Sequence, residues 1–167
     1  MTFPAESVCC FTGHRASKLP WGTNEDDERC LALKERIYDA VEAVYASGIR
    51  HYICGMANGC DMYFCEAVLE LRQSHDDITI EAAVPWEGQA SGWSPDLRTR
   101  YNRLVAECDF HTLVSREYTP DCMMRRNRYM VDSSSVLIAA YNGKPGGTMS
   151  TLLYAIRRGI EVIEVGL

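Results

Sequence analysis

The chain lacks a long hydrophobic run and an excess of basic residues. No apolar stretch approaches the roughly 20 residues that a membrane-spanning helix needs, and no basic segment precedes an apolar one in MTFPAESVCCFTGHR. We therefore expect no membrane anchor and no signal peptide, and a cytoplasmic protein. Seventeen Lys and Arg against 23 Asp and Glu leave a formal net charge of −6. This balance disfavours broad binding to nucleic acid.

Metal-binding cysteine spacing is also missing. The chain has eight cysteines but no Cys-x-x-Cys pair, and Cys60 and Cys65 have no second pair of ligands at a suitable spacing. Most of the cysteines lie inside apolar runs such as VCCF and HYICGM. This pattern predicts small buried side chains in a reducing compartment rather than disulfides. We expect no metal site and assign no cofactor.

The sequence has no Pro/Gly/Ser-rich linker, no low-complexity segment and no short repeat. Its 167 residues suit one ordinary domain and are enough to bury a sizeable core. We therefore expect residues 1–167 to form a single domain.

Short apolar runs alternate with longer segments whose apolar residues recur at helical spacing. The sequence predicts strands at residues 8–12, 51–54, 78–84, 110–114, 135–141 and 160–165. It predicts helices at residues 26–47, 59–73, 94–108, 121–131 and 148–158. Alternation of this kind is typical of an α/β fold with three layers, in which helices cover both faces of a mainly parallel sheet.

Several residues mark where the predicted elements begin and end. Gly48 and Gly159 follow helices, as glycine commonly does at a helix end. Ser94 and Asp121 stand where a side chain can cap the first turn of a helix. Pro85 is expected to stop the third strand, because proline cannot donate to a sheet ladder.

The unusual residues gather after the predicted strands, where ligands bind in an open parallel sheet. They occur in four loops, at residues 12–15, 55–61, 85–87 and 145–148. Two of these loops place glycines at a helix start, where free backbone N–H groups and a partial positive charge suit a phosphate group. Neither loop is a G-x-G-x-x-G or P-loop motif, and each could be a tight turn alone. Together they favour a phosphate-containing ligand.

Four side chains in these loops have a functional and a structural interpretation. Arg15 can hold a phosphate with two hydrogen bonds or form a surface salt bridge. His14 can act as a general base or as a loop histidine that bonds backbone or ligand. Asp61 can bind a ribose hydroxyl or compensate a helix dipole, and Trp86 can stack on a base or join the core.

A basic cluster stands at Met123-Met124-Arg125-Arg126-Asn127-Arg128. Helical spacing places Arg125 and Arg128 on one face and turns Arg126 away from them. The cluster is either an exposed charged face or a source of one or two side chains that reach the phosphate site. We expect solvated charges or ordinary salt-bridge partners at Glu66, Glu70 and Glu81.

The segments TGHR, GMANGCD, AAVPWEGQ and RRNRYMVDSSSVLIAAYNGKPGGT occur in this order. In this order and spacing, the chain resembles the YpsA-like family over about residues 6–165. That family belongs to the SLOG superfamily, named for the DNA-processing protein DprA and the LOG proteins. The resemblance implies a Rossmann-like fold and a pocket for a nucleotide or nucleotide-derived ligand, and it implies no particular reaction.

The resemblance also implies which half of a LOG-type site is present. LOG enzymes release a base from a nucleoside monophosphate with an Arg-Lys pair and a PGGxGTxxE turn. This chain has Arg126-Asn127 and Pro145-Gly146-Gly147-Thr148 at the matching places. The positions that could hold the glutamate are Thr151, Leu152 and Leu153. The phosphate-binding half is kept and the catalytic acid is missing.

We therefore expect a binding protein for a phosphate-containing small molecule, either a nucleotide or an ADP-ribose-like compound. One alternative is a LOG-like N-glycosidase that uses another acid, such as Asp61 or Glu87. A second is a protein- or single-stranded-DNA-interaction domain that uses Arg125, Arg126 and Arg128, which the net acidity disfavours. A homodimer through Tyr38 and Tyr45 is a further possibility. The predicted ligand-binding residues are Gly13, His14, Arg15, Gly55, Asn58, Gly59, Asp61, Pro85, Trp86, Arg125, Arg126, Asn142, Gly146, Gly147 and Thr148.

Overall fold

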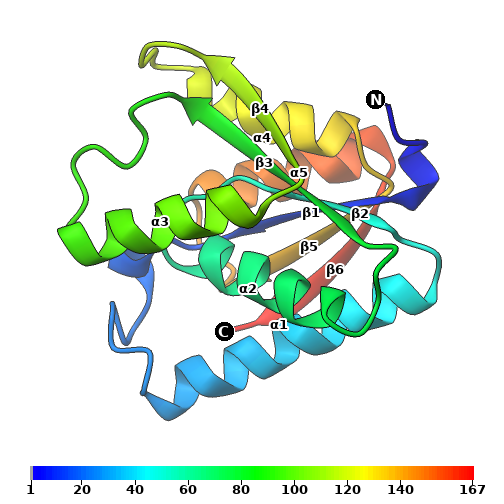
Figure 1. The fold of residues 1–167 in the computed structure, drawn as a ribbon, viewed down its shortest axis with the longest axis horizontal. Helices are drawn as coiled ribbons and strands as arrows, with labels where there is room; N and C mark the ends of the chain where they lie inside the picture. Colours follow the sequence, from blue (N-terminus) through cyan, green and yellow to red (C-terminus); the bar gives the residue numbers. More distant parts are fainter. Residues whose placement is uncertain (1) are drawn as a thin grey trace.

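Between residues 2 and 167, six short strands rich in apolar residues pair in parallel to form one sheet. The structure is a computed structural model that describes residues 2–167. The strands follow the order β4-β3-β2-β1-β5-β6 across the sheet (Figure 1). Their bounds are β1 Val8–Gly13, β2 His51–Cys54, β3 Thr79–Trp86, β4 Phe110–Ser115, β5 Val136–Tyr141 and β6 Glu161–Gly166. The central strands β1, β2 and β5 are almost entirely buried, as expected for a parallel sheet covered on both faces.

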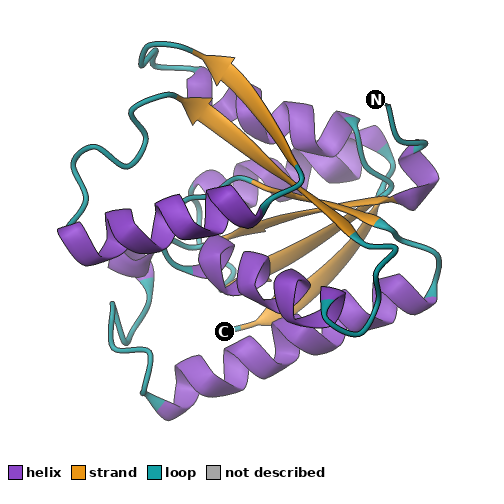
Figure 2. Ribbon diagram, viewed as in Figure 1, coloured by secondary structure: helices purple, strands orange, loops and turns teal. Residues whose placement is uncertain are grey.

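Within the described residues, five α-helices cover the two faces of this sheet (Figure 2). α1, α2 and α3 pack together on one face, and α4 and α5 pack together on the other. Two short 3-10 helices, Ala5–Ser7 and Ala16–Lys18, flank β1. The predicted three-layer α/β fold is confirmed, and all six strands are parallel. The helix bounds are α1 Glu28–Ala46, α2 Cys60–Arg72, α3 Pro95–Glu107, α4 Cys122–Asp132 and α5 Gly147–Arg158.

The larger part of the core lies between the sheet and α1, α2 and α3. Phe11 of β1 stacks on Phe64 of α2, with ring centroids 4.7 Å apart. A smaller core cluster joins the other face of the sheet to α4 and α5. The eight cysteines are all free and buried, as expected of small apolar side chains. Tyr38 and Tyr45, the predicted dimer residues, are partly buried against the larger core cluster.

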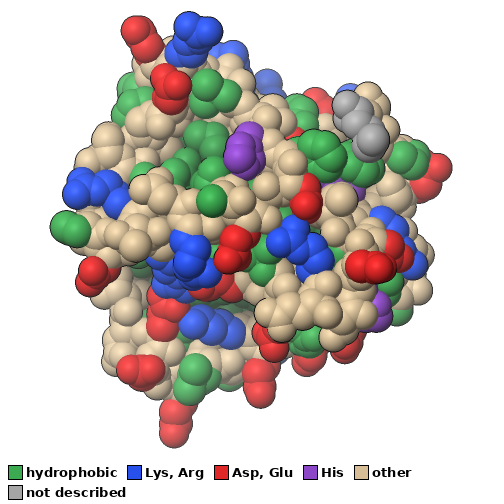
Figure 3. All heavy atoms as spheres, viewed as in Figure 1, with side chains coloured by type: hydrophobic (Ala, Val, Ile, Leu, Met, Phe, Trp, Pro, Cys, Tyr) green, Lys and Arg blue, Asp and Glu red, His purple; other side chains and the backbone are tan. Residues whose placement is uncertain are grey.

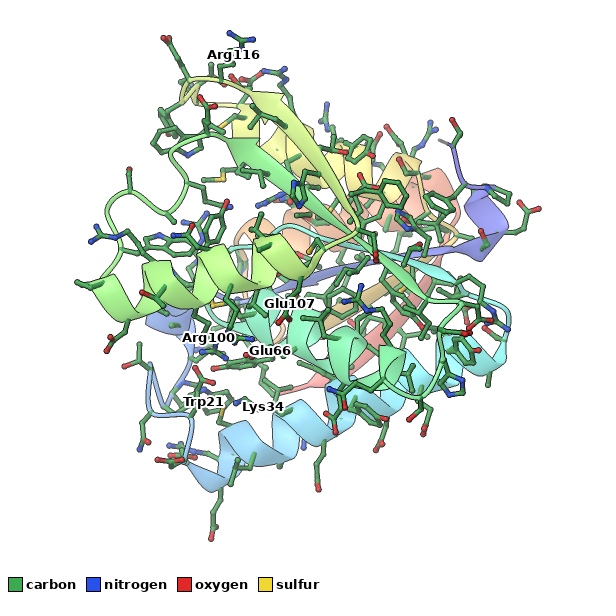
Figure 4. The ribbon with its side chains drawn as sticks, viewed as in Figure 1. Trp21, Lys34, Glu66, Arg100, Glu107 and Arg116 are labelled. Carbon is green, nitrogen blue, oxygen red and sulfur yellow. The ribbon has the colours of Figure 1, made fainter. Side chains whose placement is uncertain are left out.

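Acidic and basic side chains are interspersed on the face of the molecule that carries α3 (Figure 3). Arg100 of α3 forms ion pairs with Glu66 of α2 and with Glu25 in the segment before α1. Figure 4 shows Arg100 and Glu66 close together between these helices. Lys34 of α1 also pairs with Glu25, at 2.8 Å. The network ties three segments together and confirms the salt-bridge interpretation of Glu66.

Most predicted helix signals are confirmed. Ser94 Oγ accepts a hydrogen bond from Leu97 N–H at 3.3 Å and caps α3. Gly48 and Gly159 follow α1 and α5 with positive φ angles of 119° and 76°. Asp121 precedes α4, but its side chain does not cap the helix. Its Oδ1 instead accepts from the Thr119 hydroxyl at 2.8 Å, so the predicted cap is wrong.

The prediction that Pro85 ends the third strand is also wrong. β3 continues through Pro85 to Trp86 and stays paired with β4. The other neighbour, β2, pairs with β3 only as far as Ala82. Beyond that point one side of β3 needs no donors, so a residue without an N–H is tolerated there.

Glu81 is not a solvated surface charge. It lies in the middle of β3 with 6% of its surface exposed. Its carboxylate accepts hydrogen bonds from Thr112 at 2.7 Å and from the Tyr129 hydroxyl, and Nε2 of His51 lies 2.8 Å from it. The predicted surface charge is therefore part of a buried polar network between β2, β3, β4 and α4.

Among residues 2–167, no helix is both long and apolar enough to cross a membrane. The same residues contain no group of three or more His, Cys, Asp or Glu side chains arranged to hold a metal ion.

Candidate functional site

A polar cavity of about 260 Å³ lies beyond the carboxyl ends of β1 and β5. The chain proceeds from β1 outwards through β2, β3 and β4, and then returns to place β5 on the other side of β1. At such a reversal of strand order, the loop after β1 and the loop after β5 run in opposite directions and leave a crevice between them. Open α/β sheets bind ligands in this crevice. The cavity is lined by Phe11, Thr12, Gly13, His14, Arg15, Lys18, Ala57, Asp61, Met123, Arg126, Asn127, Met130, Gly147 and Thr148.

The loop after β1 is held tightly against the start of α2. The His14 carbonyl accepts a hydrogen bond from Cys60 N–H at 3.1 Å, and Ala16 N–H donates to Asn58 Oδ1 at 3.2 Å. Gly59 adopts a φ angle of +87°, and a Cβ atom there would lie 2.6 Å from Ala16 N. Only glycine fits this position, because both the backbone conformation and the close approach exclude a side chain.

α5 presents its N-terminus to the cavity through Gly147 and Thr148. Gly146 precedes the helix with a φ angle of +154°, which turns the chain into it without a capping side chain. Ser150 N–H donates to the Gly146 carbonyl at 3.0 Å, and the amides before it are those that a helix leaves without an internal acceptor. These donors and the helix dipole favour an anion at this end of the cavity.

Arg126 supplies a buried positive charge from α4. Only 4% of its surface is exposed, and its guanidinium donates to the carbonyl oxygens of Gly55 and Ala83. Its Nε donates to Asn127 Oδ1 at 2.8 Å. Burial lowers the pKa of Arg126, and the nearby Asp61 acts in the opposite direction. The two side chains do not form an ion pair, so within residues 2–167 the charge of Arg126 lacks a direct partner.

Asp61 lies in the first turn of α2, with 6% of its surface exposed. Its Oδ2 accepts a hydrogen bond from Ala57 N–H at 3.0 Å, which leaves part of the carboxylate free toward the cavity. Burial raises the pKa of Asp61, while Arg126 and the Ala57 amide lower it to a smaller extent. Asp61 therefore makes a structural contact with its own loop and also contributes the acidic side chain of this cavity.

His14 is buried beside the same cavity, with 5% of its surface exposed. Its Nε2 has no hydrogen-bond partner among the described residues. A buried polar atom of this kind loses free energy unless a ligand or a water molecule bonds to it. The unpartnered Nε2 of His14 therefore also indicates that a polar group binds in this cavity.

Arg15 and Lys18 are exposed at the mouth of the cavity. One terminal nitrogen of Arg15 contacts the Met123 sulfur at 3.7 Å, and no ion pair with another described residue holds the guanidinium. A Cβ atom on Gly146 would lie 3.1 Å from Lys18 Nζ, so the lysine crosses the approach to α5. Among the residues of 2–167 that line the cavity, Arg126, Arg15 and Lys18 are cations and Asp61 is the one carboxylate.

Some of the predicted site residues lie together in this cavity and others do not. Those that line it are Gly13, His14, Arg15, Asp61, Arg126, Gly147 and Thr148. Gly55, Asn58, Gly59 and Gly146 do not line it, but they shape its walls through the contacts described above. Those that lie away from it are Pro85, Trp86, Arg125 and Asn142.

The residues away from the cavity have other contacts. Trp86 packs edge-to-face against Tyr118, with ring centroids 5.8 Å apart. Arg125 is exposed and lies 3.9 Å from Asp121, while Arg128 covers the ring of Tyr154. Asn142 lies in a neighbouring cavity beside Lys144. The arginine cluster of α4 is thus divided, because Arg126 points inward and the other two point outward.

Sequence reasoning missed Lys18, Asn127 and the two methionines Met123 and Met130 as cavity residues. Lys18 stands outside the glycine-containing loops, and only the short 3-10 helix after β1 brings it back over the site. The methionines share the inward face of α4 with Arg126 at spacings of three and four residues. That spacing was a usable signal, because it placed Arg126 on the apolar face of the helix.

The positions that could hold a LOG-type glutamate carry no acid in the structure. Thr151 and Leu152 are buried, and the Thr151 hydroxyl donates to the Gly147 carbonyl at 3.0 Å. Leu153 is 50% exposed on the outer side of α5. Glu87 is also exposed and does not line the cavity, so Asp61 is the carboxylate available there.

Comparison with known proteins adds a family match. The sequence model of the YpsA family, described as the YspA SLOG family, matches residues 9–161. The SPbeta prophage-derived protein YoqJ of Bacillus subtilis is 30% identical over 138 residues, covering 75% of this chain and 81% of that protein. A UPF0398 protein of Halalkalibacterium halodurans is 26% identical over 155 residues, covering 90% and 81%.

Solved structures share the fold at low sequence identity. DNA processing protein A (DprA) of Streptococcus pneumoniae superposes with a TM-score of 0.64 at 13% identity, covering 95% of this chain and 50% of that one. DprA of Helicobacter pylori, a protein with a unique single-stranded DNA binding mode, gives 0.62 at 12% identity, covering 96% and 65%. The protein TM1055 gives 0.57 at 13% identity, covering 93% and 72%. The chain spans only half of the pneumococcal DprA.

Proposed function

The chain belongs to the YpsA family of SLOG domains, and from this premise we propose that it binds a phosphate-containing small molecule, a nucleotide or nucleotide derivative. The ligand occupies the cavity beyond β1 and β5, with its phosphate between Arg126, Lys18 and the N-terminus of α5. Asp61 and His14 lie on the same cavity and are suited to bond a ribose hydroxyl or a phosphate oxygen.

The buried guanidinium of Arg126 carries this proposal. A charge that is removed from water is costly unless an opposite charge compensates it. Arg126 has carbonyl acceptors but no carboxylate within ion-pair distance among the residues that the structure describes. A phosphate group supplies the missing charge, and Nη2 of Arg126, which contacts the Met123 sulfur at 3.9 Å, has an N–H left to donate to it. The free amides of α5 offer further donors to the same group.

Thermal denaturation with inorganic phosphate and with AMP tests the proposal. A ligand that binds only the native state must raise the melting temperature as its concentration passes the Kd. We expect both compounds to stabilise the protein at millimolar concentration. Arg126→Met is expected to lower the affinity for phosphate and for AMP by about tenfold or more, because a charge-assisted contact is lost. Arg125→Met, one position away on the exposed face, is the control and should change neither.

Two outcomes contradict the proposal. One is the absence of any stabilisation by phosphate or AMP in a protein that melts cooperatively. The other is equal binding by Arg126→Met and the parent protein.

A LOG-like hydrolase is the second candidate, and the raised pKa of Asp61 favours it. A buried carboxyl that stays protonated at higher pH can donate a proton to a leaving base. Glycoside hydrolysis commonly uses two carboxyl groups, and the described residues that line this cavity include one acidic side chain. Chromatography of bases released from nucleoside monophosphates decides the point. No release above a no-enzyme control, by folded protein, excludes it.

Single-stranded DNA binding through the arginines of α4 has weaker support. Arg126 is buried and unavailable to a polymer on the surface, which leaves Arg125 and Arg128. A gel-shift assay at low salt, where phosphate contacts are strongest, tests this function. No shift there removes it.

A further inference from the structure

A second cavity of about 620 Å³ lies beside the first and shares Lys18 with it. It opens between the segment after β1, the first half of α1 and the loop after β5. Its lining includes the apolar residues Pro20, Trp21 and Ala32, and we call these three residues its apolar floor. Four cations also line it, namely Lys18, Arg29, Arg36 and Lys144.

The charges of this second cavity are not balanced by acidic side chains. No aspartate or glutamate is among the described residues that line it. Neither Lys18 nor Lys144 has a carboxylate partner in the part of the chain that the structure describes. Arg29 pairs with Asp27, and Arg36 donates to the carbonyl oxygen of Gly166 at 2.7 Å. In a protein of formal charge −6, such a local excess of cations creates a positive potential that attracts anions.

Lys18 connects the two cavities. It lines both of them, and its Nζ lies beside Gly146 at the N-terminus of α5. Basic side chains therefore extend from the buried Arg126 in the first cavity to the exposed Lys144 in the second, and we call the two adjoining cavities the basic trough. The trough is polar at the Arg126 end and has an apolar floor at the other end.

We propose that the ligand is a nucleoside polyphosphate, with at least two phosphoryl groups. The phosphates extend from Arg126 and α5 across Lys18, and the base lies on the apolar floor beside Trp21 and Pro20. This inference rests on the proposed function, because it extends the same phosphate site. A nucleoside monophosphate has one phosphoryl group and can place it in only one of the two basic cavities. A nucleoside diphosphate has two, so that each cavity can bind one. The flat base buries apolar surface that inorganic phosphate leaves exposed to water.

Calorimetric titration with inorganic phosphate, pyrophosphate, AMP and ADP tests the inference. We expect ADP to bind about tenfold more tightly than AMP, which corresponds to one additional charge-assisted contact. We expect ADP also to bind more tightly than pyrophosphate, because pyrophosphate does not contact the floor of the second cavity.

Two matched pairs of variants locate the second half of the site. Lys144→Ala is expected to lower the affinity for ADP by about threefold, because an exposed charge is lost, and to leave the affinity for inorganic phosphate unchanged. Arg116→Ala removes the same charge at the far end of the molecule (Figure 4) and should change neither ligand. Ala32→Gln places a larger side chain at the floor of the second cavity. It should lower the affinity for ADP but not the affinity for pyrophosphate. Leu31→Gln, at the exposed neighbouring residue, should leave both unchanged.

The outcomes separate this inference from the proposed function. If none of the four compounds binds, both are overturned. If phosphate and AMP bind through Arg126, but ADP binds no more tightly and Lys144→Ala has no effect, only this inference is overturned. Equal affinity for ADP and pyrophosphate overturns the assignment of a base to the floor. If an oligothymidine binds more tightly than ADP and depends on Lys144, the trough is a nucleic-acid groove and the inference is wrong.

Discussion

Asp61 and Arg126 are buried charges that face one cavity without forming an ion pair. Each shifts the pKa of the other toward the charged form, while burial acts against both. A site of this kind is costly to the empty protein and becomes more favourable when a ligand adds charge and hydrogen bonds. Titratable groups in a cleft whose pKa values are shifted by burial and by a charged neighbour are typical of functional sites.

Asp61→Asn tests the electrostatics of the cavity. Removal of the negative charge is expected to strengthen phosphate binding about fivefold, since a like charge near the anion is lost. The carbonyl oxygen of the introduced amide can still accept from the Ala57 N–H. Calorimetric titration with inorganic phosphate measures the change, and Asp39→Asn on the exposed side of α1 is the control. Weaker phosphate binding by Asp61→Asn would contradict this assignment of charge.

The difference in stability between Asp61→Asn and the parent protein should also depend on pH. Burial raises the pKa of Asp61, so the folded protein holds this proton more tightly than the unfolded chain does. The stability from the neutral carboxyl is present below the unfolded pKa, near 4, and is lost as the pH rises through the raised value. Asp61→Asn should therefore be more stable than the parent protein at neutral pH, with a difference that narrows toward pH 4. Urea denaturation across this pH range measures the difference.

Glu81 of β3, which lies outside the cavity, shows a different balance. Burial alone would raise the pKa of its carboxyl, but hydrogen bonds from His51, Tyr129 and Thr112 outweigh this effect and lower it. The folded state therefore favours the charged form. Its contribution to stability is present above the unfolded pKa and is lost as the pH falls through the lowered value.

Glu81→Ala is expected to reduce the free energy of unfolding by about 3–5 kcal/mol, because it leaves several buried polar groups without their acceptor. Urea denaturation at neutral pH measures this loss. Glu70→Ala, at an exposed position of α2, should change stability by no more than about 0.5 kcal/mol. Equal stability of the two variants would show that the network contributes little.

At the scale of elements, the junction between the loop after β1 and the start of α2 determines the shape of the cavity. Gly59 allows the backbone of residues 14–16 to pass directly over the helix N-terminus. The His14 carbonyl then accepts from the first amide of α2, and the His14 side chain is held beside the cavity. The N-terminus of α2 is therefore occupied by the protein, and that of α5 remains open to a ligand.

Gly59→Ala is expected to destabilise the protein by about 1–3 kcal/mol and to weaken phosphate binding, because the new Cβ atom displaces this loop. Thermal denaturation and calorimetric titration on the same sample measure both effects. Gly92→Ala is the matched control, since no atom lies within 4 Å of its Cβ position. If Gly59→Ala binds phosphate with the affinity of the parent protein, the position of this loop does not determine phosphate binding.

At the scale of the whole molecule, the alternation of apolar runs and helical patterns was enough to predict the layers and the parallel sheet. The strand order was not predictable, because the pattern does not say on which side of β1 the chain returns. The exposure of Glu81 was mispredicted for a related reason. Its burial depends on His51, Thr112 and Tyr129, which come from three other elements.

The candidate site was predictable where one loop carried it and less so where distant segments met. The glycines before α2 and α5 stood out in the sequence, and both helix starts lie next to the cavity. Lys18 gave no local signal, because its place at the cavity depends on how the segment after β1 and α4 pack against each other. Asn127 stood at the place of the LOG-type Arg-Lys pair but was not assigned to the site. Pro85 and Trp86 lie in the last two positions of β3 and not in a loop after it, and β3 lies two strands from β1, so both residues lie outside the cavity.

A crystal structure of the protein grown with AMP tests the central claim most directly. We expect the phosphate beside Gly147 and Thr148, within hydrogen-bond distance of the Arg126 guanidinium. An AMP phosphate bound elsewhere on the molecule, with this cavity holding only water at saturating ligand, would contradict it.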